Sequence, residues 1–340
     1  MTAIALSVVI PTFQRRQSVL RLLTSLARQT YPPGACEVIV VVDGSTDGTG
    51  AAVRAFTAPY ALSALERPNR GRAAACNAGI GAARGEIVIL LDDDMEASAE
   101  FLAAHARAHE APGRRAVVGA APIVAGPDAP PFVRYMAAGF RSRLDRLARP
   151  GYRLRFRDVY TGNCSVRRDA LLEVGGFDEG FQIYGHEDYE LALRLQAAGV
   201  ELTFSPEALA HQHYDKTFAA FARDGVARGR TAVLFAGKHP AAAESIRLGQ
   251  YHEGPVTWRA LRAMMLALSR SSDRAPERVV RLVGALERWH APRLEKWYRY
   301  AIDYLFWYGA RAAMREPRAE ENAVDLGMTG RPAASGLREP

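Results

Sequence analysis

The chain has 340 residues, of which 49% are hydrophobic and 24% are charged, as in a globular protein with one large α/β domain and an appended segment. No run of about 18 apolar residues occurs, and the start of the chain lacks the basic region of a signal peptide, so neither a transmembrane helix nor export is indicated. Cys36, Cys76 and Cys164 form no C-x-x-C pair, which argues against a disulfide framework or a zinc site. We therefore expect a cytoplasmic protein.

The net charge of +7 comes entirely from the last third of the chain. Residues 1–214 hold 23 basic and 23 acidic side chains, whereas residues 215–340 hold 21 basic and 14 acidic ones. A basic segment favours an anionic partner such as a membrane surface or a nucleic acid, and a solvated basic face is the simpler alternative. No nucleic-acid-binding motif is present, so we expect no nucleic-acid partner.

Strands and helices alternate in the first half of the chain. Apolar runs predict strands, and helical spacing predicts helices between them, at 6–10, 18–29, 37–42, 50–56, 73–83 and 86–91. This alternation is typical of an α/β fold with a parallel sheet and helices on both faces. Ligands bind such sheets at the carboxyl ends of the strands, where Asp43 and residues 92–94 stand.

The second half begins with the same alternation and then becomes helical. We predict a helix, a strand, a loop, a second strand, a Gly-rich loop, a second helix and a last strand at 99–109, 116–119, 122–131, 161–166, 175–185, 187–198 and 201–204. Beyond residue 214, amphipathic patterns predict helices at 217–234, 257–269 and 292–314. The polar residues 315–340 are predicted to be a disordered tail.

Three consecutive aspartates, Asp92, Asp93 and Asp94, follow the third predicted strand. Adjacent carboxylates repel each other unless a cation lies among them. In an extended strand Asp92 and Asp94 point the same way, so both can face one ion while Asp93 faces elsewhere. A divalent metal held there can bridge the two phosphates of a nucleotide diphosphate and stabilise the charge of the leaving group. The alternative is an acidic turn that caps the next helix.

Two further motifs suit a nucleotide. Asp43 ends the second strand, and its carboxylate can accept a hydrogen bond from a nucleobase or a ribose hydroxyl. The alternative there is an Asx-turn that begins a helix. The segment N-R-G-R at 69–72 offers arginines that can bind a diphosphate through bidentate hydrogen bonds, and the alternative is a surface loop.

Two motifs near residue 200 suit catalysis and metal binding. Glu187 and Asp188 begin a helix, whose dipole keeps a carboxylate ionised as a general base must be, although the dipole alone also explains acidic residues there. His211 and His213 follow the last predicted strand. Either imidazole can complete a carboxylate metal site, or both can be structural.

In their order and spacing these segments resemble the family 2 glycosyltransferases, which have the GT-A fold. The matching segments lie at 7–15, 37–49, 69–80, 85–95, 162–181 and 185–199. The resemblance covers roughly residues 5–215. It implies a Rossmann-like GT-A catalytic domain over 1–215 with a mixed, mainly parallel sheet, divided into a donor half at 1–95 and an acceptor half at 96–215. Residues 216–314 then form a helical C-terminal extension.

The resemblance also implies roles for individual residues. Donor binding falls to Thr12, Asp43, Arg72, Asp92 and Asp93. Metal binding falls to Asp92, Asp94 and His211, with His213 in reserve. The acceptor-flanking loop holds Gly176, Phe177 and Asp178, and the catalytic pair is Asp188, as the base, with Glu187 beside it. The sequence departs from the family pattern where Val42 replaces the first residue of the usual Asp-Asp pair.

The activity implied is an inverting, metal-dependent transfer of a sugar from a nucleotide-diphosphate sugar to an acceptor hydroxyl. The resemblance favours a UDP-sugar, Mn²⁺ or Mg²⁺ as cofactor, and a glycan or lipid-linked acceptor. The alternative from another class is a nucleotide-sugar-binding scaffold protein without catalysis. A nucleotidyltransferase is disfavoured, because residues 11–16 lack a Gly-rich basic signature.

Two segments outside these motifs carry hypotheses of their own. Residues 141–157 hold seven arginines and one acid, which favours contact with an anionic acceptor, such as a lipid-linked phosphate or an acidic glycan, or else forms a solvated helix face. Residues 292–314 combine Trp and Tyr with basic residues, as does a peripheral helix at the inner face of a membrane. The alternative for that helix is packing over the catalytic domain or at a homodimer interface.

Overall fold

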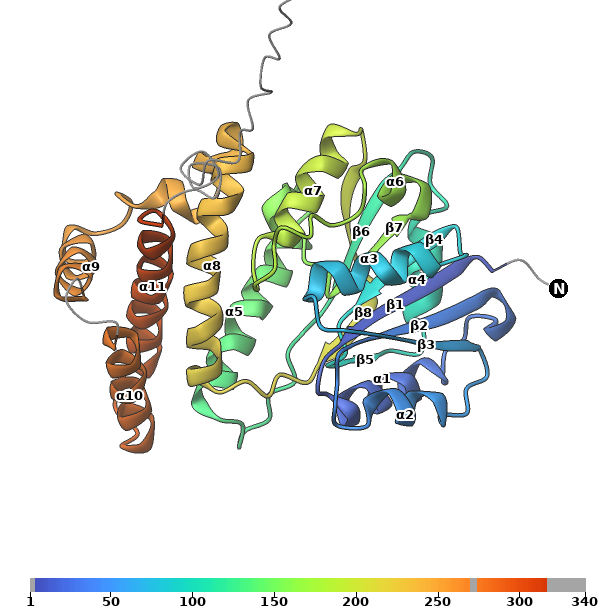
Figure 1. Ribbon diagram of the computed structural model, residues 1–340, viewed down its shortest axis with the longest axis horizontal. Helices are drawn as coiled ribbons and strands as arrows, with labels where there is room; N and C mark the ends of the chain where they lie inside the picture. The colour runs from blue at the N-terminus through green and yellow to red at the C-terminus, as the bar shows by residue number, and fades with distance from the viewer. Residues whose placement is uncertain (1–3, 270–273, 317–340) are drawn as a thin grey trace, which may run out of the picture.

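The computed structural model describes residues 4–269 and 274–316, and Figure 1 shows a sheet with helices on both faces beside a group of long helices. In the described chain the sheet has eight strands in the order β3-β2-β1-β4-β7-β6-β8-β5. The strands are β1 (Leu6–Thr12), β2 (Cys36–Asp43), β3 (Ala61–Arg67), β4 (Ile87–Leu91), β5 (Met95–Ala97), β6 (Arg115–Ala120), β7 (Asn163–Arg167) and β8 (Glu201–Gln212). All run parallel except β7 and β5, which confirms the predicted mixed, mainly parallel sheet.

Both faces of the sheet are buried, and this explains why the first strands are continuous apolar runs. In β1, Val8 packs with α1 (Arg16–Leu26), α2 (Thr49–Arg54) and α4 (Phe101–Ala108), while its neighbour Val9 packs on the other face with α3 (Arg72–Ala82). Two more helices, α6 (Arg168–Glu173) and α7 (Glu187–Ala197), join α3 in that second layer. The second layer continues without a break into the C-terminal helices.

The C-terminal helices pack on α5 (Pro131–Leu147) through aromatic rings. The ring of Phe132 lies 5.4 Å from that of Phe218 and 5.2 Å from that of Tyr298. The helices of this region are α8 (Phe218–Lys238), α9 (Val256–Leu268), α10 (Ala275–Arg288) and α11 (Leu294–Ala313), with short 3₁₀ turns η3 (Pro240–Ser245) and η4 (Arg247–Gln250) between α8 and α9. Two further 3₁₀ turns are η1 (Pro33–Ala35) and η2 (Phe156–Asp158).

Helices α8 and α11 lie backbone to backbone because each carries a glycine at the crossing, and they run side by side in Figure 1. A Cβ added at Gly229 would lie 2.0 Å from the carbonyl oxygen of Phe306, and one added at Gly309 would lie 2.0 Å from that of Val226. Any larger residue would force the helices apart. The two glycines therefore set the distance between α11 and α8.

Several elements escaped the sequence analysis for identifiable reasons. β3 is an edge strand with a half-exposed pattern, so it has no apolar run to mark it. α5 lies where the sequence analysis proposed a Pro- and Gly-rich loop ending at residue 131 and, after it, an arginine cluster. β8 was predicted to end at residue 204, yet it continues to Gln212 because its second half pairs with the three-residue strand β5. This extension places His211 inside the strand rather than after it.

The aromatic helix proposed for a membrane surface, α11, packs against other helices of the protein. In α11, Tyr298 and Tyr304 are each 1% exposed and Trp307 is 5% exposed, so these rings face protein, whereas Trp297 is 43% exposed. This arrangement matches the alternative of a helix packed over the catalytic domain. Across residues 4–269 and 274–316, no helix has the length and apolar character needed to cross a bilayer. The predicted tail at 315–340 lies, from residue 317 on, outside the described residues.

Candidate active site

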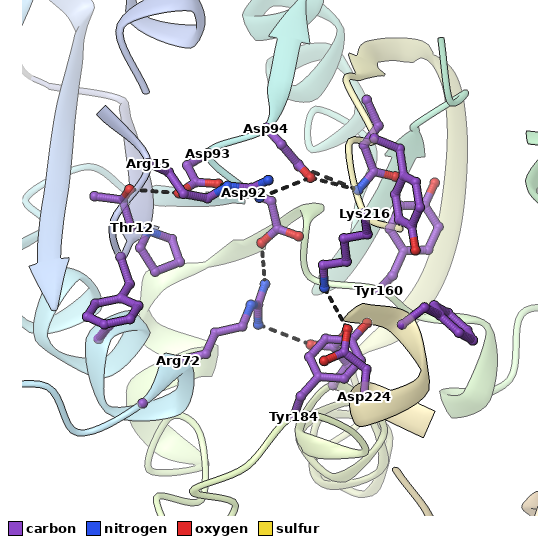
Figure 2. Close-up of a pocket in the computed structure, with 18 of the residues that line it drawn as sticks. Thr12, Arg15, Arg72, Asp92, Asp93, Asp94, Tyr160, Tyr184, Lys216 and Asp224 are labelled. Atoms are coloured by element: carbon purple, nitrogen blue, oxygen red, sulfur yellow. Dashed lines mark hydrogen bonds and ion pairs between the residues drawn. The ribbon is translucent and has the colours of Figure 1, made fainter. Parts of the chain in front are cut away.

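A cavity of about 450 Å³ opens at the carboxyl ends of β1, β2 and β4, where ligands bind α/β sheets. We call it the first cavity (Figure 2). The sequence-predicted residues that line it are Thr12, Asp43, Arg72, Asp92, Asp93, Asp94 and Asp188. Residues up to 176 positions apart in the chain therefore meet in one place.

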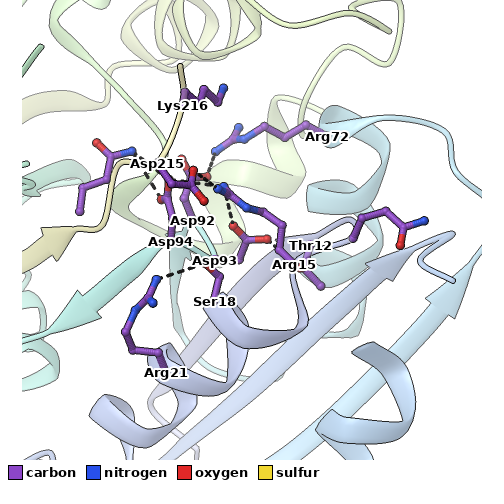
Figure 3. Close-up of polar contacts among 12 residues, drawn as sticks. Thr12, Arg15, Ser18, Arg21, Arg72, Asp92, Asp93, Asp94, Asp215 and Lys216 are labelled. Carbon is purple, nitrogen blue, oxygen red and sulfur yellow. Dashed lines mark hydrogen bonds and ion pairs between the residues drawn. The ribbon is translucent and has the colours of Figure 1, made fainter. Parts of the chain in front are cut away.

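Residues 92–94 form a tight turn directly after β4, not a continuation of the strand. The backbone N–H of Met95 donates to the carbonyl oxygen of Asp92 at 3.3 Å, which closes the turn. Asp93 accepts a hydrogen bond of 2.7 Å from the Thr12 hydroxyl, and Arg15 Nη1 lies 3.5 Å from both Asp93 and Asp94 (Figure 3). The expected strand ends at Leu91, so a turn sets the directions of these side chains, and all three carboxylates line the first cavity.

This acidic turn carries more negative charge than its protein partners offset. Burial, and to a smaller extent the negative charge of Asp92, raises the pKa of Asp94 to about 6. Burial also raises the pKa of Asp93 to about 7, although Arg15 and Thr12 act in the opposite direction. A bound cation would remove this conflict between burial and charge.

The side chains around Asp94 fit a cation that takes most of its ligands from a bound substrate and not from the protein. Among the described residues, no three His, Cys, Asp or Glu side chains are grouped so that they could hold a metal by themselves. Asp92 and Asp94 nevertheless offer the carboxylate oxygens that Mg²⁺ and Mn²⁺ prefer. Such ions are commonly held by one or two carboxylates together with substrate phosphates. The donor set therefore fits a divalent ion that arrives with a diphosphate.

The structure does not bring His211 to this turn. β8 alternates, so Gln212 faces the turn and its Nε2 lies 3.2 Å from Asp94, while His211 is exposed and stands opposite Glu96 in the register of β8 and β5. The side chain of His213, the reserve choice, contacts the Glu96 carboxylate, at 2.6 Å from Nε2. The backbone N–H of His213 donates to the carbonyl oxygen of Asp94 at 2.8 Å, so His213 lies next to the turn and a histidine ligand stays a prediction.

Arg72 joins the acidic turn to the start of α7. Its Nη2 donates to Asp92 at 2.8 Å, and its Nη1 donates to Thr161 at 2.8 Å and to Asp188 at 3.3 Å (Figure 2). Gly162 makes room for this arrangement, since a Cβ there would lie 2.4 Å from an oxygen of Asp92. One guanidinium thus links the candidate metal ligand to the candidate base.

Asp188 and Glu187 point to different places although they are adjacent. Asp188 lines the first cavity and also accepts a hydrogen bond from the Thr161 hydroxyl. Glu187 is 4% exposed, accepts a hydrogen bond of 2.8 Å from the backbone N–H of Gly185, and does not line the cavity. Burial and the charge of Asp188 raise the pKa of Glu187 to about 7. Asp188 is therefore the carboxylate that an acceptor can reach.

Asp43 holds a loop over the strand ends. Its carboxylate accepts hydrogen bonds from the backbone N–H groups of Arg70 and Gly71, at 3.2 Å and 2.9 Å, and it also lines the cavity. Gly44 is needed at the edge of this loop, because it has a φ of +79° and a Cβ there would lie 2.8 Å from the backbone nitrogen of Asn69. Asp43 thus shapes the wall of the site in addition to facing it.

The comparisons with known proteins agree with this geometry. The family model "Glycosyl transferase family 2" matches residues 7–175, and "N-terminal domain of galactosyltransferase" matches residues 142–217. The chain belongs to glycosyltransferase family 2. It is 31% identical over 228 residues to a validoxylamine A glucosyltransferase of Streptomyces hygroscopicus subsp. limoneus. That alignment covers 60% of this chain and 50% of the glucosyltransferase. It is 30% identical over 254 residues to the uncharacterized glycosyltransferase YfnE of Bacillus subtilis, covering 58% of this chain and 61% of YfnE.

The chain thus spans between half and two thirds of the length of these two relatives. Solved structures share its GT-A fold over nearly its whole length. The mannosyltransferase PcManGT of Pyrobaculum calidifontis, solved with GDP-Man and Mn²⁺, has a TM-score of 0.63 at 21% identity, covering 93% of this chain and 88% of its own. Residues 1–349 of S. aureus TarS, solved with UDP-GlcNAc, give a TM-score of 0.53 at 17% identity, with 93% of both chains covered.

The loop predicted to flank the acceptor lies outside the first cavity of this family 2 glycosyltransferase. Gly176 has a φ of +68°, and a Cβ there would lie 2.5 Å from the side-chain oxygen of Asn77. That oxygen accepts from the backbone N–H of Phe177 at 2.7 Å, and Asp178 pairs with Lys238 of α8. Gly176, Phe177 and Asp178 therefore join α3 to α8, and none of them lines the cavity.

Other residues of the site were missed by the sequence analysis. Arg15 lies between the acidic turn and Asp215, 2.6 Å from the latter (Figure 3), and its place three residues after the end of β1 was a usable signal. Lys216 bonds Asp224 at 2.7 Å, and its ammonium lies 5.1 Å from the Tyr184 ring (Figure 2). The contacts of Lys216 depend on where α8 packs, and no local sequence pattern predicts that packing.

Proposed function

We propose that this chain transfers a sugar from a nucleotide-diphosphate sugar to a hydroxyl group of an acceptor, with inversion at the anomeric carbon. The observation that carries this proposal is the Arg72 bridge between Asp92 and Asp188 within one cavity. One nitrogen of this guanidinium bonds Asp92, where a diphosphate and its metal ion would bind, and the other bonds Asp188, which is suited to act as the general base.

Each side chain then has a defined part in a direct displacement. The Asp188 carboxylate accepts the proton of the acceptor hydroxyl, whose oxygen forms a bond to the anomeric carbon as the bond to the diphosphate breaks. The diphosphate leaves with the electron pair, and Arg72 donates hydrogen bonds to it. A divalent cation, Mn²⁺ or Mg²⁺, bound at Asp92 and Asp94 would neutralise charge on that leaving group. Thr12 and Arg15 hold Asp93, and so hold the turn in place.

For the donor, UDP-sugars are our first expectation and GDP- and dTDP-sugars the alternatives. Two structural neighbours, solved with GDP-Man and with UDP-GlcNAc, support a nucleotide-sugar donor without choosing between bases. Asp43 at the cavity wall and the nearby backbone of Gly71 are the groups that we expect to contact the nucleotide. The acceptor would be a glycan or a lipid-linked saccharide.

A thermal-shift panel tests the donor site. UDP, GDP and dTDP, each with and without Mn²⁺, are added to the wild-type chain and to Asp94→Ala. We expect one nucleotide to raise the melting temperature only with Mn²⁺, and we expect Asp94→Ala to abolish that rise. If no nucleotide stabilises the wild type, or if Mn²⁺ makes no difference, the proposed donor site is wrong.

The second candidate is a scaffold protein that binds a nucleotide sugar without catalysis. An intact Asp188, exposed to the cavity beside Arg72, argues against it. Slow hydrolysis of the donor sugar, abolished in Asp188→Asn, separates the two candidates. A scaffold would bind the donor and leave it unhydrolysed in both proteins.

A further inference from the structure

A second cavity, of about 690 Å³, lies against the first and is strongly basic. Residues of α5, η2, α7, α8, η4 and α11 line it. Six guanidinium groups among the described residues line it: Arg143, Arg146, Arg155, Arg157, Arg228 and Arg247. Four of these belong to the arginine cluster at 141–157, and the other two come from the helical extension.

The acidic side chains nearby do not neutralise this cavity. Asp158 is its one lining carboxylate, and it already accepts hydrogen bonds from Tyr152 at 2.8 Å and from the backbone N–H of Arg155 at 3.0 Å, with Arg146 at 3.3 Å. Arg247 is paired outside the cavity, with Asp303 at 2.7 Å. Among the described residues, only Arg146 and Arg247 of the six lining arginines therefore form an ion pair with a carboxylate, while Glu187 and Asp188 act on Arg228 at longer range.

Four of the lining guanidinium groups form no ion pair with a carboxylate of residues 4–269 and 274–316: that of Arg155, which is exposed, and those of Arg143, Arg157 and Arg228, which are partly buried. Arg143 donates to the carbonyl oxygen of Asp158 at 3.0 Å, and its buried Nε has no partner. Arg157 donates to the carbonyl oxygen of Ser245 at 2.8 Å. Arg228 makes neither a hydrogen bond nor an ion pair with described residues, and its guanidinium carbon lies 5.9 Å from the centre of the Tyr184 ring. Unpaired charges in a partly buried site favour binding of a counter-ion.

The wall between the two cavities is the start of α7. Asp188 lines the first cavity, His186 lines the second, and Tyr189 and Arg228 line both. Gly185 allows α8 to come this close, because a Cβ there would lie 2.8 Å from Cγ of Arg228. A molecule that fills both cavities therefore passes directly beside the carboxylate assigned as the base.

We propose that the second cavity binds the phosphate group of the acceptor, so that the substrate is a phosphate-bearing saccharide. This assignment rests on the proposed function, since it places the acceptor relative to Asp188. The three partly buried, unpaired guanidinium groups match a phosphate dianion better than a single-charged carboxylate. The Phe221 and Phe306 rings, which also line the cavity, offer apolar surface to the rest of the molecule.

Binding measurements by calorimetry test the assignment. Glucose 1-phosphate, farnesyl phosphate below its micelle concentration, and inorganic phosphate are titrated into the wild type, with the first cavity either free or saturated with the nucleotide and Mn²⁺. The test variant is R157Q/R228Q. The control is R149Q/R153Q, which removes two arginines of the same cluster that line a different cavity. R157Q alone repeats the test without changing α8.

We expect R157Q/R228Q to weaken binding of the organic phosphates at least tenfold, R157Q to weaken it at least threefold, and the control to leave it within twofold. Tighter binding of farnesyl phosphate indicates a lipid-linked acceptor, and tighter binding of glucose 1-phosphate indicates a soluble one. Equal affinities in the test variant and the wild type, or binding of inorganic phosphate alone, overturn the proposal.

Failure of the proposed function has a separate signature. In that case, none of UDP, GDP and dTDP binds to the wild type, while the phosphate titrations still depend on Arg157 and Arg228. That outcome overturns the assignment of the cavity to an acceptor and identifies only an anion site.

Discussion

The first cavity takes its charged groups from the ends of strands, whereas the second takes them from helices and turns packed outside the sheet. Among the described residues, six carboxylates and five cationic side chains line the first, and burial raises the pKa of Asp93 to about 7. The second is dominated by guanidinium groups, which keep their charge when buried. Under the two proposals, we expect the first cavity to take a cation together with the diphosphate donor and the second to take the phosphate group of the acceptor.

The helical extension contributes to both sides of this contrast. Lys216, just before α8, lines the first cavity, and Arg228 of α8 lines both. Since α8 is held by its glycine crossing with α11, the extension positions the site as well as covering the sheet.

The strongest test removes the proposed base. Asp188→Asn keeps the size of the side chain but cannot accept the acceptor proton, so we expect the rate of sugar transfer to fall by about 10²–10⁴-fold. Nucleotide affinity should stay close to that of the wild type. Glu187→Gln is the matched control and should lose far less activity, because Gln can still accept from the Gly185 N–H. Equal losses in the two variants would contradict the assignment of Asp188.

The second test breaks the bridge between donor and base. Arg72→Met leaves Asp92 and Asp188 without the cation that they share, and removes a donor to the leaving group. We expect kcat to fall by about 10²–10³-fold, as when one transition-state donor is lost elsewhere. Arg72→Lys should recover only part of this, because one ammonium cannot form the bidentate contacts. A variant with unchanged kcat and only a raised KM would show that Arg72 stabilises the bound substrate and the transition state equally.

The third test moves α8. Gly229→Ala places a methyl group against the carbonyl oxygen of Phe306, so we expect the free energy of unfolding to fall by about 1–3 kcal/mol. Gly237→Ala, on the same helix with open space around it, should instead stabilise by about 0.5–1 kcal/mol. Denaturant titration measures both changes. If the crossing positions the second cavity, Gly229→Ala will also weaken phosphate binding and Gly237→Ala will not.

The fourth test uses pH at the wall between the cavities. Burial, together with the charge of Arg228, lowers the pKa of His186 to about 3. The unfolded chain, with an ordinary pKa near about 6.5, binds this proton first, so the contribution of His186 to stability falls as pH decreases below that value. Between pH 6.5 and 5.5 the loss should be about 1 kcal/mol. His186→Asn, which tolerates the φ of +66°, should flatten that part of the stability curve. An unchanged slope would mean that His186 is protonated in the folded protein.

The local pattern of the sequence predicted the sheet well where burial on both faces makes strands apolar. β1, β2 and β4 and the helices between them lie close to the expected ranges. β3 and β5 were missed, because an edge strand and a three-residue strand have too few buried side chains to leave a pattern. The acidic turn and Asp188 were found because they follow strand ends or begin a helix, which are local features.

The sequence by itself determined the fold class, the acidic turn at the carboxyl edge and the pair of carboxylates that begins α7, since each depends on residues close together in the chain. Only the tertiary structure decided that Gln212 and not His211 faces Asp94, that Asp188 and not Glu187 reaches the cavity, and which arginines at 141–157 face inward. These outcomes depend on how far β8 pairs with β5 and on how closely α8 approaches α7 and α11. Contacts of that kind form between segments distant in sequence, so no local periodicity records them.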